Sequence, residues 1–171
     1  MANMIPISTV TVGSGGSSII QFTSIPQIYT DLVIKLSGRT DRVSTYDFVK
    51  LKFNGSATSY SERSLNGNGT AAASETNNAT TYGFNYIVDA ASATSNTFGN
   101  FEIYIPNYTS GNNKSYSTDA VNENNATTAF TAFTAGLWSN TSPINTISME
   151  SANSANFVQY STATLYGIRK Y

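Results

Sequence analysis

The sequence predicts an all-β domain, an antiparallel two-sheet sandwich of jelly-roll type with about eight to ten strands. Three observations lead to this class. Apolar and polar residues alternate with a period of two in many short segments. Turn-forming residues separate these segments at intervals of about 8 to 12 residues. No segment of any length shows the periodicity of a helix, and 171 residues suit one domain, which we expect to span residues 1–171.

The clearest alternation lies in residues 31–39 and 48–53. Both segments place apolar side chains on one parity, which we expect to face the core: Leu32, Ile34, Leu36, Val49, Leu51 and Phe53. In residues 98–105 the same rule turns Glu102 and Tyr104 outward. The final segment has Ala163 and Leu165 on the core side. Its other parity, which we expect to face water or a partner, holds Thr162, Thr164, Tyr166 and Ile168.

Turn signals predict how some segments pair. Residues 5–12 and 18–22 flank a glycine-rich turn and are expected to form a hairpin. The first and last strands look suited to lying side by side, which favours the jelly roll. Residues 115–122 and 127–138 are a second expected pair.

Two further segments lie in the middle of the chain. Asn54-Gly55 is a strong signal for a two-residue turn, with residues 57–65 as the returning strand. Residues 66–80 are rich in small and polar residues without periodicity. We expect them to form a long loop.

The composition restricts the chemistry. The sequence has no cysteine and no histidine, which removes thiolate metal sites, disulfides and the commonest general base and metal ligand. Charged residues make up 11%, whereas 65 residues are Ser, Thr or Asn. The net charge of −1 argues against binding to nucleic acid or an anionic membrane. We expect no enzyme and no cofactor.

Several groups of oxygen-bearing side chains are candidates for a catalytic carboxylate pair or a calcium site. Asp119 with Glu123, and Asp41 with Asp47, are spaced as carboxylate pairs, but solvated turn charges explain them more simply. The span from Asp119 to Asn125 is rich in oxygen ligands, yet its spacing matches no calcium loop. We predict no metal site.

Trp138, the only tryptophan, ends an apolar strand beside Ser139 and Asn140. An aromatic ring beside amides suits a sugar platform, whereas a tryptophan at a strand end more often fills a core or an interface. Both alternatives stay open at this point.

Charge is unevenly distributed along the chain. Residues 31–63 carry a net charge of +2, residues 64–168 carry −5 and residues 169–171 carry +2. If folding preserves this separation, the protein has a basic and an acidic patch suited to docking or to contact between copies. The alternative is that these charges intermix in space.

Three parts of the sequence resemble a group of small virion proteins of tailed phages, especially cyanophages. They are Val10 to Gly16 with Phe22 to Leu32, Ile105 to Tyr108, and Ala155 to Ile168. The resemblance implies a β-sandwich on the outside of a virion that is made in the host cytoplasm. It further implies a capsid decoration (cement) protein, oligomeric and most often trimeric, that binds the major capsid protein. A tail-associated carbohydrate- or receptor-binding module is the alternative.

The candidate contact residues combine basic and aromatic side chains at places that could meet a partner. They are Arg39, Arg42, Trp138, Tyr166, Arg169, Lys170 and Tyr171.

Overall fold

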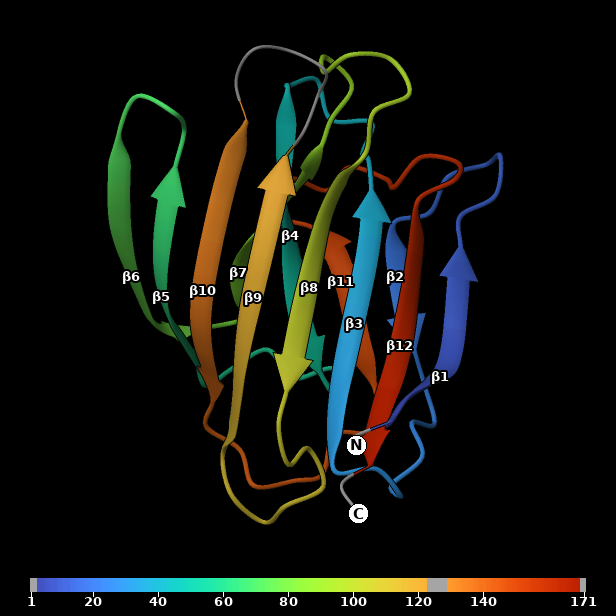
Figure 1. Cartoon of the computed structure of the whole chain (residues 1–171), viewed down its shortest axis with the longest axis vertical. Coiled ribbons are helices and arrows are strands. Elements are labelled where there is room, and N and C mark those ends of the chain that lie inside the picture. Colours follow the sequence, from blue (N-terminus) through green and yellow to red (C-terminus); the bar gives the residue numbers. More distant parts are fainter. Residues whose placement is uncertain (1–2, 123–128, 170–171) are drawn as a thin grey trace.

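The computed structural model describes residues 3–122 and 129–169, which form two antiparallel sheets without any helix (Figure 1). The described residues contain no helix that is long and apolar enough to cross a membrane. The strands of the described part are β1 (Asn3–Thr11), β2 (Ile19–Phe22), β3 (Asp31–Gly38), β4 (Tyr46–Phe53), β5 (Tyr60–Gly67), β6 (Ala72–Thr80), β7 (Gly83–Asp89), β8 (Gly99–Ile105), β9 (Lys114–Asn122), β10 (Phe130–Trp138), β11 (Ile147–Ser151) and β12 (Thr162–Arg169). This confirms the all-β sandwich, with more strands than the eight to ten expected.

The strand order shows how the chain moves between the two layers. The larger sheet has the order β1-β12-β3-β8-β9-β10-β5-β6, and the smaller has β2-β11-β4-β7. Four antiparallel pairs are nested along the chain: β1 with β12, β2 with β11, β3 with β8, and β4 with β7. The expectation that the first and last strands lie side by side is therefore confirmed.

Four strands lie outside this nested set, and all of them extend the larger sheet. β5 and β6 follow β4 in the chain and pair with each other, and β9 and β10 follow β8 and do the same. β10 joins the two pairs because it also pairs with β5. Figure 1 shows β6 at the edge of the larger sheet, beyond the strands of the smaller one.

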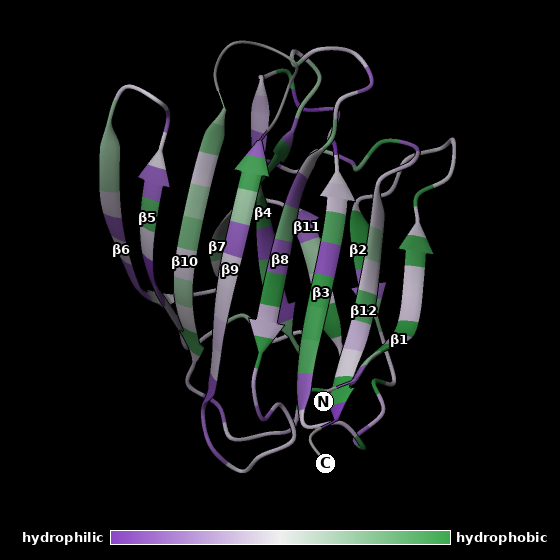
Figure 2. Cartoon of the chain, viewed as in Figure 1, coloured by the Kyte–Doolittle hydropathy of each residue, from purple (hydrophilic) through white to green (hydrophobic). Residues whose placement is uncertain are grey.

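The core lies between the sheets and follows the predicted parity. All six apolar side chains assigned inward in β3 and β4 are at most 2% exposed, which confirms that assignment. Figure 2 shows the alternation of hydrophobic and hydrophilic residues along β8. Trp138 stacks on Tyr60 at 6.2 Å between ring centroids and packs against Phe53 at 5.6 Å. These rings fill the core below β10.

Two predicted hairpins are wrong, although their strands exist. β1 and β2 lie in different sheets, so the glycine-rich turn between them crosses from one layer to the other. Asn54 and Gly55 do form a tight turn, with φ of 52° and 68°. The strand that follows, β5, pairs with β10 rather than with β4. Turn chemistry determines the reversal of the chain but not the layer that receives the next strand.

The long loop predicted for residues 66–80 is also wrong. β5 continues to Gly67 and β6 begins at Ala72, so most of this segment is an edge strand. Nearly every described side chain of β6 is exposed. Because neither face of β6 is covered, its sequence needs no alternation, and the periodicity that identifies other strands is missing.

Candidate functional site

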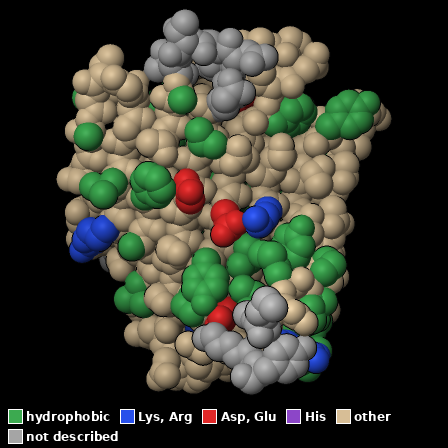
Figure 3. Space-filling model, viewed as in Figure 1, with side chains coloured by type: hydrophobic (Ala, Val, Ile, Leu, Met, Phe, Trp, Pro, Cys, Tyr) green, Lys and Arg blue, Asp and Glu red, His purple; other side chains and the backbone are tan. Residues whose placement is uncertain are grey.

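The outer face of the larger sheet, turned away from the smaller sheet, is hollowed (Figure 3). One hollow of about 700 Å³ crosses β8, β9, β10, β5 and β6. A second of about 570 Å³ continues it across β3 and β12. Glu102 and Asp119 line both hollows. We call the two adjoining hollows, which meet at these two carboxylates, the sheet trough.

One row of exposed side chains crosses the sheet trough in cross-strand register. Lys35 lies opposite Glu102, Glu102 opposite Asp119, Asp119 opposite Phe133, and Phe133 opposite Leu65. All five point outward because successive residues of a strand alternate between faces. Figure 3 shows hydrophobic, acidic and basic side chains following one another across the middle of this face.

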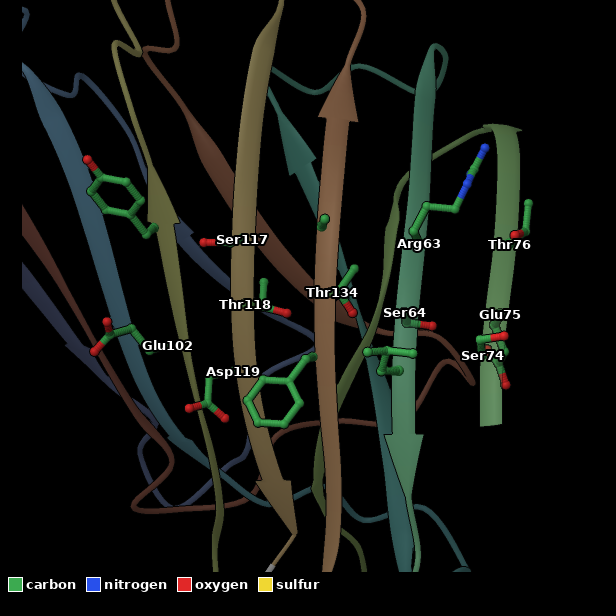
Figure 4. Close-up of a pocket in the computed structure, with 14 residues that line it drawn as sticks. Arg63, Ser64, Ser74, Glu75, Thr76, Glu102, Ser117, Thr118, Asp119 and Thr134 are labelled. Atoms are coloured by element: carbon green, nitrogen blue, oxygen red, sulfur yellow. The ribbon is translucent and has the colours of Figure 1, made fainter. Parts of the chain in front are cut away.

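The charges in this row are only partly compensated. Lys35 Nζ lies 3.0 Å from Glu102 Oε2, and about half of each side chain is exposed, so the pair contributes little to stability. Asp119 lies next to Glu102 (Figure 4), and its carboxylate has no ion pair or hydrogen bond with another described residue. Like charges directly opposite one another destabilise a sheet. The centre of the trough therefore holds a carboxylate with free acceptor capacity.

A second row lies beside the first. Tyr104, Ser117, Ala135 and Arg63 follow one another in register across β8, β9, β10 and β5. Tyr104 donates its hydroxyl to Asp31 Oδ2 at 2.9 Å. Partial burial, this hydrogen bond and the charge of Asp31 all raise the pKa of Tyr104. The ring is therefore held in place as a neutral phenol.

The wall of the trough formed by β5 is braced from the inner side of the sheet. Glu62 is 1% exposed and accepts hydrogen bonds from Tyr116 Oη at 2.9 Å and from the Phe84 N–H at 2.7 Å. These bonds tie β5 to β9 in the same sheet and to β7 in the other layer. The shape of the trough therefore does not depend on β5 and β6 alone.

Arg39, predicted as a contact residue, is instead an internal brace. It is 8% exposed, and its guanidinium donates five hydrogen bonds into residues 91–97. The acceptors are the carbonyl oxygens of Ala91, Ala93, Thr94 and Thr97 and the Thr97 hydroxyl. Arg39 therefore fastens the segment between β7 and β8 and presents almost no surface to a partner.

Arg42 lies next to a buried carboxylate. Its guanidinium is 3.6 Å from Asp47 Oδ1, with one third of the side chain exposed. Asp47 is fully buried and also accepts hydrogen bonds from Thr40, Ser151 and Asn153. Asp47 thus connects three segments of the chain. The carboxylate pair considered for Asp41 and Asp47 does not form, because Asp41 accepts hydrogen bonds from Asn156 instead.

Trp138 is wrong as a contact residue for the same reason as Arg39. It is 1% exposed, lies in the aromatic core, and donates its indole N–H to Ser56 Oγ at 3.3 Å. Of the two alternatives weighed for this residue, core filling is confirmed. It offers no platform to a sugar.

Tyr166 and Arg169 lie at the far end of β12 from Arg39. Tyr166 and Tyr104 flank Val33, which faces outward yet is only 3% exposed, so the three form an apolar patch that meets the trough at Tyr104. Arg169 is exposed, with its guanidinium 5.3 Å from the centre of the Tyr29 ring. Both stay candidates for contact. Lys170 and Tyr171 lie outside the described residues.

Folding mixes the charges that are separated along the chain. Lys35 pairs with Glu102, and Lys52 pairs with Glu150 at 3.2 Å, so basic residues of one segment meet acidic residues of the other. Asp119 faces outward, whereas Asn122 is buried and donates to Asp89. Glu123, Asn124 and Asn125, the other oxygen donors of the candidate calcium segment, lie outside the described residues. Among those described, no group of three or more acidic side chains is gathered as for a metal ion.

Sequence reasoning missed the trough itself. The outward parity of Glu102 and Tyr104 was predictable from alternation, and so was that of Asp119. They lie beside Phe133 and Leu65 because the strand order is β8-β9-β10-β5. In this order β5 pairs with β10 and not with β4, the strand that precedes it in the chain.

Searches against protein-family models and curated proteins find no match to this chain.

Proposed function

We propose that this protein is a non-enzymatic structural protein of a tailed-phage virion, a decoration protein that binds the major capsid protein on the assembled shell. The observation that carries the proposal is the strand order. Four nested pairs distributed over two sheets support a jelly-roll interpretation of the sandwich, a topology found in viral capsid domains, lectins and cupins. Topology alone does not determine function, and the resemblance of the three sequence segments to phage virion proteins supports the capsid assignment among these classes.

The use of charge supports a structural role as well. The chain has nine basic and ten acidic residues. Within the described part, six of them are buried: Asp31, Arg39, Asp47, Glu62, Asp89 and Lys114. Arg39, Asp47 and Glu62 each connect separate segments, and Lys114 donates to the carbonyls of Ser110 and Asn112. This internal bracing gives a rigid body with a mostly uncharged polar exterior, which suits repeated contacts on a symmetric shell.

The docking surface in this proposal is the outward-facing patch of Tyr104, Val33 and Tyr166, together with Arg169 at the end of β12. Aromatic and arginine side chains are the types that contribute most in interfaces. Each contact is modest, and a homo-oligomer, with a trimer favoured, multiplies it through effective concentration. The alternative, a tail-associated carbohydrate- or receptor-binding module, does not have Trp138 as its platform because that ring is buried.

The test is binding of the purified protein to empty capsids of the phage that encodes it and, in parallel, to host cells. Saturable binding to capsids at a fixed copy number per capsomer is expected. Tyr166→Ala and deletion of residues 169–171 should weaken binding without loss of folding. Tyr160→Ala is the matched control, because this tyrosine is 68% exposed and lies just before β12, at the end opposite Arg169. Binding to cells alone, with none to capsids, would refute the proposal.

A further inference from the structure

The sheet trough combines two features that call for a ligand of mixed character. Phe133 is 52% exposed and Leu65 is 63% exposed, and they lie directly opposite each other in register. Single exposed apolar residues are ordinary. Here two of them are adjacent, open into one hollow, and stand next to Asp119, whose carboxylate has no partner among the described residues.

The charge of the lining argues against nucleic acid as a ligand. Lys35 and Arg63 are opposed by Glu75, Glu102 and Asp119, so the trough has no strong charge of either sign. Nucleic acid requires a basic surface with several contacts to phosphate. A ligand that suits this lining is uncharged, has apolar faces for Phe133 and Leu65, and carries donors for the carboxylates.

Protein ligands fit the trough less well than a carbohydrate does. An extended peptide binds a sheet at its edge, through unpaired backbone groups. The trough lies on the face, where the backbone groups of β8, β9 and β10 are already paired with their neighbours. A second copy of this chain is disfavoured because interface centres are depleted of charged residues, whereas two carboxylates occupy the centre here.

We propose that the sheet trough binds an uncharged oligosaccharide. The apolar face of a sugar ring packs on Phe133, and its hydroxyls donate to Asp119 and Glu102, with Ser117 and Tyr104 beside them. The two hollows share Glu102 and Asp119 in their linings and together extend from β12 to β6, six strand spacings apart. At about 4.8 Å per spacing this is roughly 29 Å, which accommodates several linked sugar rings. This activity goes beyond capsid decoration and does not depend on it.

The test is titration calorimetry of the purified full chain with neutral hexasaccharides of glucose, galactose, mannose, xylose and N-acetylglucosamine. At least one is expected to bind with a Kd of about 1 mM or tighter. Phe133→Ala should weaken that binding about tenfold, since it removes an aromatic contact. Asp119→Ala should also weaken it. Both side chains are exposed, so both variants should retain the wild-type melting temperature.

Tyr160→Ala is the matched control, because it removes an exposed aromatic ring outside the trough, and it should bind as the wild type does. Absence of binding to every hexasaccharide overturns the proposal, and so does unchanged binding by Phe133→Ala. Self-association measured by light scattering supplies a third outcome. If Phe133→Ala dissociates an oligomer, the trough is an interface between copies and the proposal fails. Capsid binding is measured separately, so failure of one proposal leaves the other unaffected.

Discussion

Replacing Arg39 by methionine should destabilise the fold substantially. Methionine preserves much of the aliphatic volume and removes all five hydrogen bonds to residues 91–97. Ala91 and Thr94 are exposed, so their carbonyls can bind water instead. Ala93 and Thr97 are 9% and 8% exposed, and their carbonyls would be left largely without partners. Unsatisfied buried groups cost about 1–3 kcal/mol each. The expected loss is therefore about 3 kcal/mol in the free energy of unfolding.

Urea unfolding followed by the fluorescence of Trp138 measures this loss. A companion thermal scan should show a decrease in Tm of about 6–12 °C for a chain of this size. Arg42→Met is the matched control, because Arg42 is one third exposed and makes a 3.6 Å ion pair. It should cost less than about 1 kcal/mol, since Asp47 keeps its other donors. If the two variants are equally stable, Arg39 is not a brace. Loss of capsid binding by a fully stable Arg39→Met would restore it as a contact residue.

Two further predictions concern the aromatic core. Burial raises the pKa of Tyr60 to about 12, against about 10 in an unfolded chain, so its contribution is complete below pH ~10 and is lost as the pH rises through ~12. As the pH rises between these values, Tyr60→Phe should lose about 2–3 kcal/mol less stability than the wild type in urea titrations. Gly136→Ala would place its Cβ 2.1 Å from the Tyr116 ring, so we expect a loss of about 3 kcal/mol in the free energy of unfolding. Gly111→Ala, with open space around it, should leave the urea midpoint unchanged, and equal midpoints for the two glycine variants would contradict the packing at Tyr116.

Alternation was enough to assign strands that have one covered face. Leu32, Ile34 and Leu36 are buried as predicted because the smaller sheet packs over them. The same rule failed for β6, which has no covered face and therefore no alternation to detect. Alternation also could not predict the partners of β2 and β5. A turn such as Asn54-Gly55 reverses the chain without determining which sheet the next strand enters.

The contact residues could be judged only after folding. Arginine and tryptophan are frequent in interfaces, but both also fill interiors when partners are available. Arg39 has backbone carbonyls around it, and Trp138 has Tyr60 and Phe53, so both are buried. Phe133 has neither, because it lies on the opposite parity from its buried neighbours Ala132 and Thr134. Its place in the trough, opposite Asp119 and Leu65, is set by how β10 pairs with β9 and β5, which the local sequence does not predict.

The added strands explain why the trough exists. The eight strands of the nested pairs supply four strands to each sheet, and β5, β9 and β10 add Tyr60, Tyr116 and Trp138 to the core between them. β9, β10, β5 and β6 are not needed to complete those pairs, and they bring a buried carboxylate, Glu62, that must be satisfied by Tyr116 and Phe84. They also add outer surface, because most of the main hollow lies on them. A wide sheet also twists and curves, which hollows its face. The extension therefore contributes both to the aromatic core around Trp138 and to the outer face on which the trough lies.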